Sequence, residues 1–302
     1  MAVRFSLIMA TLGRSREIGL MLDSLETQTF KDFEVVIVDQ NGDERVTEIL
    51  AARQRPFPVR HLRTPKARGL SRGRNDGAKQ AKGDIFGFPD DDCTYPSWLL
   101  QKVSDTFAKT GAAVVNGRAG DETGRPINGR FFEGAGWTEP RGVFNSLIEW
   151  VSFCTREAFE AVGGYDVDVG VGASSPWQAC EGPDIVLRMM ARGYKVYYDY
   201  AIYGHHPEIS IDATDPRMQQ KALGYGRGMG YVLGKHDLGF AYSMNFMLRS
   251  LGGAVISFAK GQRGRGAYYL KTLQGRLEGY RDGRRERGAT ASGSRKVAAT
   301  GH

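Results

Sequence analysis

The chain has 302 residues, 41% hydrophobic and 25% charged, a composition typical of a soluble globular protein with one large or two modest domains. Its three cysteines, Cys93, Cys154 and Cys180, include no CxxC pair, which argues against a disulfide scaffold or a structural zinc site and favours a reducing compartment. Residues 249–302 carry twelve Lys or Arg and three acids, a net charge of +9 against +7 for the whole chain, so residues 1–248 have a net charge of −2.

The N-terminus lacks the pattern of a signal peptide, because a short apolar strand begins almost at once and is soon followed by Arg14 and Arg16. Strands and helices then alternate. Apolar runs predict buried strands at 3–9, 33–38, 59–62 and 84–88, and apolar residues at helical spacing predict helices at 15–28, 43–54, 97–109 and from about 70 to 82. A strand, a helix and a strand within about forty residues form a βαβ unit, which indicates a parallel sheet.

Polar side chains follow three of these strands, at the edge where such sheets bind ligands. The last group belongs to Asp90-Asp91-Asp92, whose first and third side chains point the same way if the chain is extended. Two aligned carboxylates suit Mg²⁺ or Mn²⁺, although a polar loop after a strand is an equally simple reading of the triplet alone. The three groups are Thr11 with Arg14, Asp39 with Asn41, and Asp90 with Asp92.

The order of these motifs is more specific than any one of them. A strand with Ala-Thr-x-x-Arg, a strand with Val-Asp, Gly-Leu-Ser-x-x-Arg-Asn, and Asp-Asp-Asp-x-x-x-Pro-x-Trp-Leu follow one another. This series resembles the nucleotide-sugar-binding half of family 2 glycosyltransferases over roughly residues 3–205. The resemblance implies an α/β GT-A-type (Rossmann-like) fold: a mixed, mostly parallel sheet flanked by helices, followed here by C-terminal amphipathic helices.

The resemblance also implies a donor site. Asp39 would meet the base, usually uracil or guanine, Arg74 the diphosphate and Asp90 the ribose, while Asp92 would bind the metal, Mn²⁺ or Mg²⁺. A late histidine, His205 or its neighbour His206, is a further candidate metal ligand, with a loop-holding or acceptor-binding role as the alternative. The other residues expected to line the nucleotide-sugar pocket are Ala10, Thr11, Arg14, Asn41, Ser71 and Asp91.

A second carboxylate cluster is where relatives carry the catalytic base. Gly182 occupies the place of the usual base, so Glu181 is the expected base, and Asp184 is the fallback or an acceptor-binding residue. Both are also simply explained as acids at a helix start, which are favourable there. Trp137 and Trp177 are weaker candidates for stacking on the acceptor sugar, with core packing as the alternative.

The C-terminal part predicts helices at 213–235, 240–259 and 266–281. Residues 240–259 have the length of a membrane span, but Asn245, Arg249 and the Gly252-Gly253 pair interrupt it. An interfacial helix is expected instead. Its lipid-facing residues would be Phe240, Phe246, Met247, Leu251 and Phe258, and its headgroup contacts Lys260, Arg263, Arg265 and Lys271. For the apolar residues of the helix at 266–281, core packing against the catalytic domain is the alternative.

We therefore predict a catalytic domain at 1–210, a basic helical region at 211–287 that docks on a membrane surface, and a disordered tail at 288–302. The expected activity is metal-dependent, inverting transfer of a sugar from a UDP- or GDP-linked donor to a saccharide hydroxyl. A lipid-linked saccharide used in surface polysaccharide synthesis is one acceptor, at the cytoplasmic face of the cell membrane.

Two other classes compete with this reading. A nucleotidyltransferase acting on a sugar phosphate would show a glycine-rich loop after its first strand, whereas residues 10–14 are poor in glycine. A nucleic-acid-binding protein using the basic tail would carry a helix-turn-helix, zinc or RNA-recognition signature, and none is found, so no nucleic-acid partner is expected.

Overall fold

The computed structural model describes residues 5–208 and 212–299, with side chains described as far as residue 289. It divides into two compact units: Met1–Val167 with Ile185–Ile209, and Asp168–Asp184 with Ser210–His302. The chain passes from the first unit to the second near residue 210, where the sequence predicts the boundary between 1–210 and 211–287. Residues 168–184, which the sequence assigns to the catalytic domain, group instead with the C-terminal helices.

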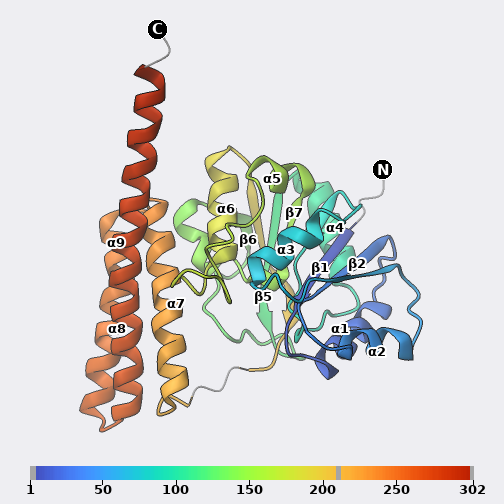
Figure 1. Ribbon diagram of the computed structural model, residues 1–302, viewed down its shortest axis with the longest axis horizontal. Helices are drawn as coiled ribbons and strands as arrows, with labels where there is room; N and C mark the ends of the chain where they lie inside the picture. Colours follow the sequence, from blue (N-terminus) through green and yellow to red (C-terminus); the bar gives the residue numbers. More distant parts are fainter. Residues whose placement is uncertain (1–4, 209–211, 300–302) are drawn as a thin grey trace. The chain divides into compact units, whose positions relative to one another are not determined.

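The first unit is built on one eight-stranded sheet, flanked by helices (Figure 1). Strands β1, β2, β3 and β4 are parallel, as are β5 and β8, whereas β7 and β6 run antiparallel to their neighbours. This confirms the predicted mixed, mostly parallel α/β fold. The strand order is β3 (Val59–Arg63), β2 (Phe33–Asp39), β1 (Phe5–Thr11), β4 (Ile85–Gly87), β7 (Ser152–Thr155), β5 (Val114–Gly120), β8 (Val196–His205) and β6 (Ala135–Trp137).

The central strands bring the polar groups together. Every residue of β1 and β2 is buried, as expected for strands covered on both faces, and their register sets Thr11 opposite Asp39 at the carboxyl ends. Helix α3 lies close against them, since a Cβ on Gly77 would come within 2.4 Å of Ile8. The helices of this unit are α1 (Arg16–Glu26), α2 (Arg45–Ala52), α3 (Leu70–Ala78), α4 (Leu99–Thr110), α5 (Arg156–Ala161), the short 3₁₀ segments η1 (Pro140–Asn145) and η2 (Glu149–Val151), and most of α6 (Glu181–Ala191).

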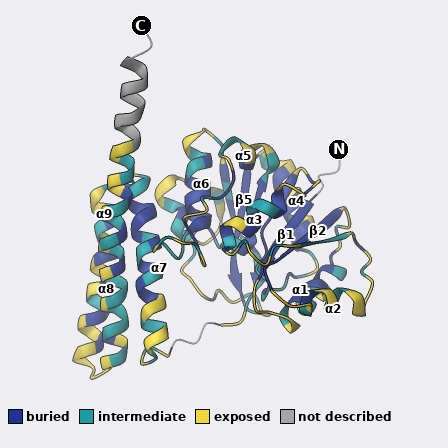
Figure 2. Cartoon of the chain, viewed as in Figure 1, coloured by how far each residue is buried: buried dark blue, intermediate teal, exposed yellow. Residues whose placement is uncertain are grey.

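The second unit contains three long helices, α7 (Pro216–Lys235), α8 (Phe240–Ala259) and α9 (Arg263–Ala299). Helices α7 and α9 meet backbone to backbone: a Cβ on Gly230 would lie 2.2 Å from the Arg276 carbonyl oxygen, and one on Gly279 would lie 2.0 Å from that of Arg227. Figure 2 shows buried residues along α7, which is where this contact lies. The glycines that face one another are Gly226, Gly230 and Gly234 on α7 and Gly275, Gly279 and Gly283 on α9.

Helix α9 also corrects one expectation. Residues 288–302 were predicted to be disordered, but 288–299 continue α9 as helix, and 300–302 lie outside the described residues. Among residues 5–208 and 212–299, no helix is both long and apolar enough to cross a bilayer.

Candidate functional site

Three aspartates follow β4, and each is held by a side chain from a different part of the first unit. Arg74 donates to Asp90 (3.0 Å), and the Thr11 hydroxyl donates to Asp91 (2.6 Å). Arg14 reaches Asp92 at 2.5 Å. The structure thus brings together predicted residues that lie up to 81 positions apart in the sequence.

Arg74 is a fixed cation rather than a solvated one. Its side chain is 1% exposed on α3, where Ser71 is also buried, and its guanidinium lies 5.3 Å from the centre of the Tyr165 ring. Burial beside the Asp90 carboxylate fixes the guanidinium within the site, and a guanidinium can bind carboxylate or phosphate oxygens in a bidentate way. Arg14, by contrast, is 44% exposed and bridges Asp92 and Asp91 at the edge of the site.

The three carboxyl groups differ in acidity. Burial raises the pKa of Asp90, and burial also raises the pKa of Asp91 to about 6. The pKa of Asp92 is instead lowered, chiefly by its bond to His206, and the same bond raises the pKa of the His206 imidazole. Asp92 is therefore the most readily ionised of the three, as a ligand for a hard cation must be.

The histidine at this site is His206. Its Nε2 lies 3.2 Å from Asp92 Oδ1, and its ring stacks on Trp150. His205, the residue expected here, ends β8, pairs through its backbone with Thr94, and places Nδ1 3.4 Å from the Gly120 carbonyl oxygen. Of the two candidate histidines, His206 and not His205 therefore lies against Asp92, because successive side chains of an extended segment point to opposite sides.

The expected base-recognition residue, Asp39, is completely buried. Its Oδ1 accepts from the Asn41 backbone N–H (2.9 Å) and side-chain amide (2.8 Å), and its Oδ2 lies 3.0 Å from His61 Nε2. Asn41 in turn accepts from the Gly13 N–H (2.7 Å), which fixes the turn after β1, and Ala10 is buried nearby in that strand. His61 on β3 was missed, because only the pairing of β3 with β2 brings it to Asp39.

The second carboxylate cluster lies in the second unit, called the helical unit from here on, at the start of α6. Glu181 is its first residue and is only 6% exposed. Asp184 is fully buried, with Oδ1 2.8 Å from His236 Nε2 and 3.1 Å from Lys235 Nζ. Two partners about fifty residues away therefore tie Asp184 to the end of α7, which favours a structural role for it.

The two candidate tryptophans differ. Trp177 stacks on Tyr231 at 3.7 Å between ring centres and donates to Asp282 (3.3 Å), so it packs within the helical unit. Trp137 on β6 is 51% exposed and contacts Tyr197 edge to face, which leaves much of its indole open. Only Trp137 keeps the surface that stacking on a sugar requires.

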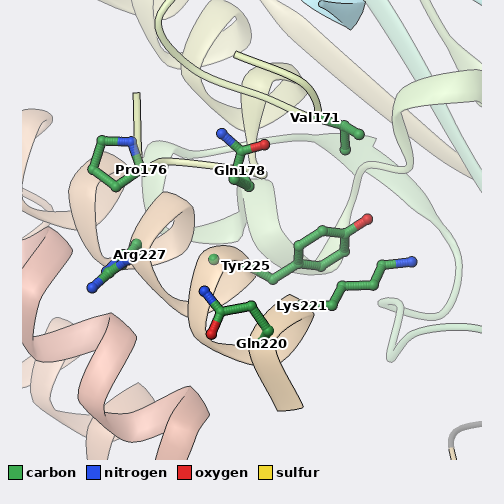
Figure 3. Close-up of a pocket in the computed structure, with 8 residues that line it drawn as sticks. Val171, Pro176, Gln178, Gln220, Lys221, Tyr225 and Arg227 are labelled. Atoms are coloured by element: carbon green, nitrogen blue, oxygen red, sulfur yellow. The ribbon is translucent and has the colours of Figure 1, made fainter. Parts of the chain in front are cut away.

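The helical unit also has a pocket of about 440 Å³ between the 171–178 loop and α7 (Figure 3). The Gln178 amide holds the loop by donating to the Ala173 and Ser175 carbonyl oxygens. Lys221 lies 5.0 Å from the Tyr225 ring, while Arg227 is paired with Glu278 (2.6 Å). The lining residues are Val171, Pro176, Gln178, Gln220, Lys221, Gly224, Tyr225 and Arg227.

Comparisons with known proteins agree with this architecture. Residues 6–146 match the family described as Glycosyl transferase family 2. An uncharacterized glycosyltransferase of Haemophilus influenzae is 39% identical over 234 residues, which are 74% of this chain and 75% of that protein.

Two solved structures share the fold at low sequence identity. The mannosyltransferase PcManGT from Pyrobaculum calidifontis, in complex with GDP-Man and Mn²⁺, has a TM-score of 0.59 at 14% identity, over 93% of this chain and 88% of that one. S. aureus TarS in complex with UDP-GlcNAc has a TM-score of 0.54 at 15% identity, over 93% and 92%. The family match and the Haemophilus influenzae relative show that the chain belongs to glycosyltransferase family 2.

Proposed function

We propose that this glycosyltransferase transfers a sugar from a UDP- or GDP-linked donor to a saccharide hydroxyl, with inversion and with a divalent metal. The observation that carries the proposal is the cluster around Asp92, which Arg14 and His206 contact and which follows the Arg74–Asp90 pair at the carboxyl end of the sheet. The UDP-GlcNAc of TarS and the GDP-Man and Mn²⁺ of PcManGT support the same ligand classes.

The residues present fit a metal that is shared with the donor. Asp92 and His206 offer two ligands, and across the described residues no three His, Cys, Asp or Glu side chains form a metal-binding group. Mg²⁺ and Mn²⁺ commonly use one or two protein ligands and take the rest from phosphate and water. The imidazole favours Mn²⁺, and the bound metal would neutralise charge on the departing diphosphate.

The remaining residues of the cluster would position the donor. Arg14 would exchange Asp92 for a phosphate oxygen, and the Arg74 guanidinium, fixed beside Asp90, would bind the diphosphate. Asp39 and Asn41 would meet the base, with Ala10, Thr11 and Ser71 forming the walls, and Asp90 and Asp91 would face the ribose and the donor sugar.

The acceptor would be a saccharide, and within the helical unit the 440 Å³ pocket presents Lys221 and Tyr225, which suit a polar ring or a charged substituent (Figure 3). We further propose a lipid-linked saccharide and a protein that is peripheral on the cytoplasmic face of the membrane. The basic, apolar surface of the C-terminal helices supports this assignment.

A thermal-shift screen tests the donor class. UDP- and GDP-sugars are each added with Mn²⁺ or with EDTA, and one of them is expected to raise Tm by several degrees only when the metal is present. An absence of stabilisation by every nucleotide sugar in both conditions would overturn the proposal.

The proposed base is Glu181, whose carboxylate would accept the acceptor hydroxyl proton as the oxygen bonds to the anomeric carbon and the bond to the diphosphate breaks. Glu181→Gln is expected to lower kcat by about 100- to 10,000-fold while donor affinity stays unchanged. Asp184→Asn is the comparison: it weakens the contacts with Lys235 and His236, so it should lower Tm and reduce kcat only modestly. Near-normal turnover of Glu181→Gln together with inactive but stable Asp184→Asn would move the role to Asp184.

A further inference from the structure

Helix α8 has an exposed face that is apolar and a buried face that carries several serines. Six of its large apolar side chains are exposed, from 43% for Leu251 to 66% for Phe240. Four of them, at 248, 251, 255 and 258, follow the i, i+3, i+7, i+10 spacing of a single helical stripe. The exposed set is Phe240, Leu248, Leu251, Val255, Ile256 and Phe258.

The opposite face of α8 is rich in serine and is buried. Ser243, Ser250 and Ser257 recur every seven residues and are at most 3% exposed. Arg276 of α9 donates to the Ser250 hydroxyl (2.6 Å) and to the Phe246 carbonyl oxygen (2.5 Å), which fixes this face inward. Phe246 and Met247, expected on the lipid side, are buried here instead.

A water-facing helix of a globular protein has the reverse pattern, with apolar residues inward. An exposed apolar stripe along a helix of twenty residues, about 30 Å long, marks an interaction surface. The α8 face, defined by the six residues above, is therefore an apolar surface that is exposed in the described structure.

The basic residues around the α8 face indicate which kind of partner covers that face. Residues 238–277 contain six Lys or Arg and no Asp or Glu, and Arg249, Lys260, Arg263 and Arg265 are exposed. We propose that the α8 face inserts into the surface of an anionic lipid bilayer, with these four cations contacting the headgroups. A basic margin around an apolar helix face is the combination that interfacial binding uses.

A second copy of the chain is a poorer occupant. Pairing two α8 faces would bring two basic margins together without an acid between residues 238 and 277 to offset them, and like charges at an interface are unfavourable. A bilayer-spanning arrangement is also excluded for the described helices, since none is apolar enough. The inference concerns α8 alone and does not depend on the sugar transfer proposed above.

Vesicle co-sedimentation of the full chain, without nucleotide or metal, tests the inference. Vesicles of phosphatidylcholine alone are compared with vesicles containing 30% phosphatidylglycerol, and the wild type should bind the anionic ones at least about tenfold more tightly. Leu248→Gln/Val255→Gln should lose about tenfold or more in affinity, because both side chains are 60% exposed and would enter the lipid. Lys260→Glu/Arg263→Glu should remove the preference for the anionic vesicles.

The matched control is Leu20→Gln/Phe132→Gln, which changes two side chains in the first unit that are 48% and 51% exposed. It should bind vesicles as the wild type does, and circular dichroism should show all variants equally helical. Absence of binding to anionic vesicles, or equal binding by Leu248→Gln/Val255→Gln, would overturn the proposal. So would sedimentation equilibrium showing a dimer that Leu248→Gln/Val255→Gln converts to a monomer.

Discussion

Replacing Asp92 with Ala is expected to lower kcat/KM for sugar transfer by about 100- to 1,000-fold, the loss typical of removing one preorganised group that stabilises developing charge. Asp92 is the carboxylate whose pKa is lowered, and both Arg14 and His206 bond to it. Release of nucleoside diphosphate, measured with the donor found by thermal shift, gives the rate.

The matched control is Asp105→Ala, which removes an exposed carboxylate from α4 and should leave the rate unchanged. The histidine pair provides a second comparison, since His206→Ala should weaken Mn²⁺-supported turnover and His205→Ala should not. Wild-type turnover in Asp92→Ala, or equal effects of the two histidine variants, would contradict the assignment of Asp92 and His206.

Gly279→Ala is expected to unfold the helical unit more easily, lowering its free energy of unfolding by about 1–3 kcal/mol or more through overpacking. The added Cβ would lie 2.0 Å from the Arg227 carbonyl oxygen, and because that atom is backbone, α7 and α9 must separate. The effect opposes helix propensity, which favours Ala over Gly by about 1 kcal/mol. Urea unfolding followed by circular dichroism measures it.

Gly252→Ala on α8 is the control, because no atom lies within 4 Å of the Cβ that it would add. It should leave stability unchanged or raise it by up to about 1 kcal/mol. If Gly279→Ala proved as stable as Gly252→Ala, close packing of α7 on α9 would be wrong.

The elements predicted best are those with long, unambiguous patterns. Buried strands β1 and β2 read as continuous apolar runs, and α1, α4, α7 and α8 show helical spacing. Strands β6 and β7 were missed, since they have three and four residues and are stabilised by pairing with distant strands. The glycines of α7 were visible in the sequence, but their contact with those of α9, about fifty residues on, was not.

The donor side of the site was largely predictable, because carboxyl ends of parallel strands meet at one edge. Thr11, Arg14, Arg74 and the aspartate triplet are brought together as expected. The sequence could not predict those side-chain contacts of the site residues that depend on strand register and on tertiary packing. His61 lies beside Asp39, His206 rather than His205 lies beside Asp92, and Lys235 and His236 lie beside Asp184.

The central claim is that Asp92 and the donor diphosphate hold one metal ion together. Isothermal titration of UDP and GDP, each with Mn²⁺ and with EDTA, tests it most directly. We expect Mn²⁺ to tighten the binding of one nucleotide at least about tenfold, the nucleotide to tighten Mn²⁺ by the same factor, and Asp92→Asn to abolish this coupling. Nucleotide binding of equal strength in Mn²⁺ and EDTA, or coupling that persists in Asp92→Asn, would contradict it.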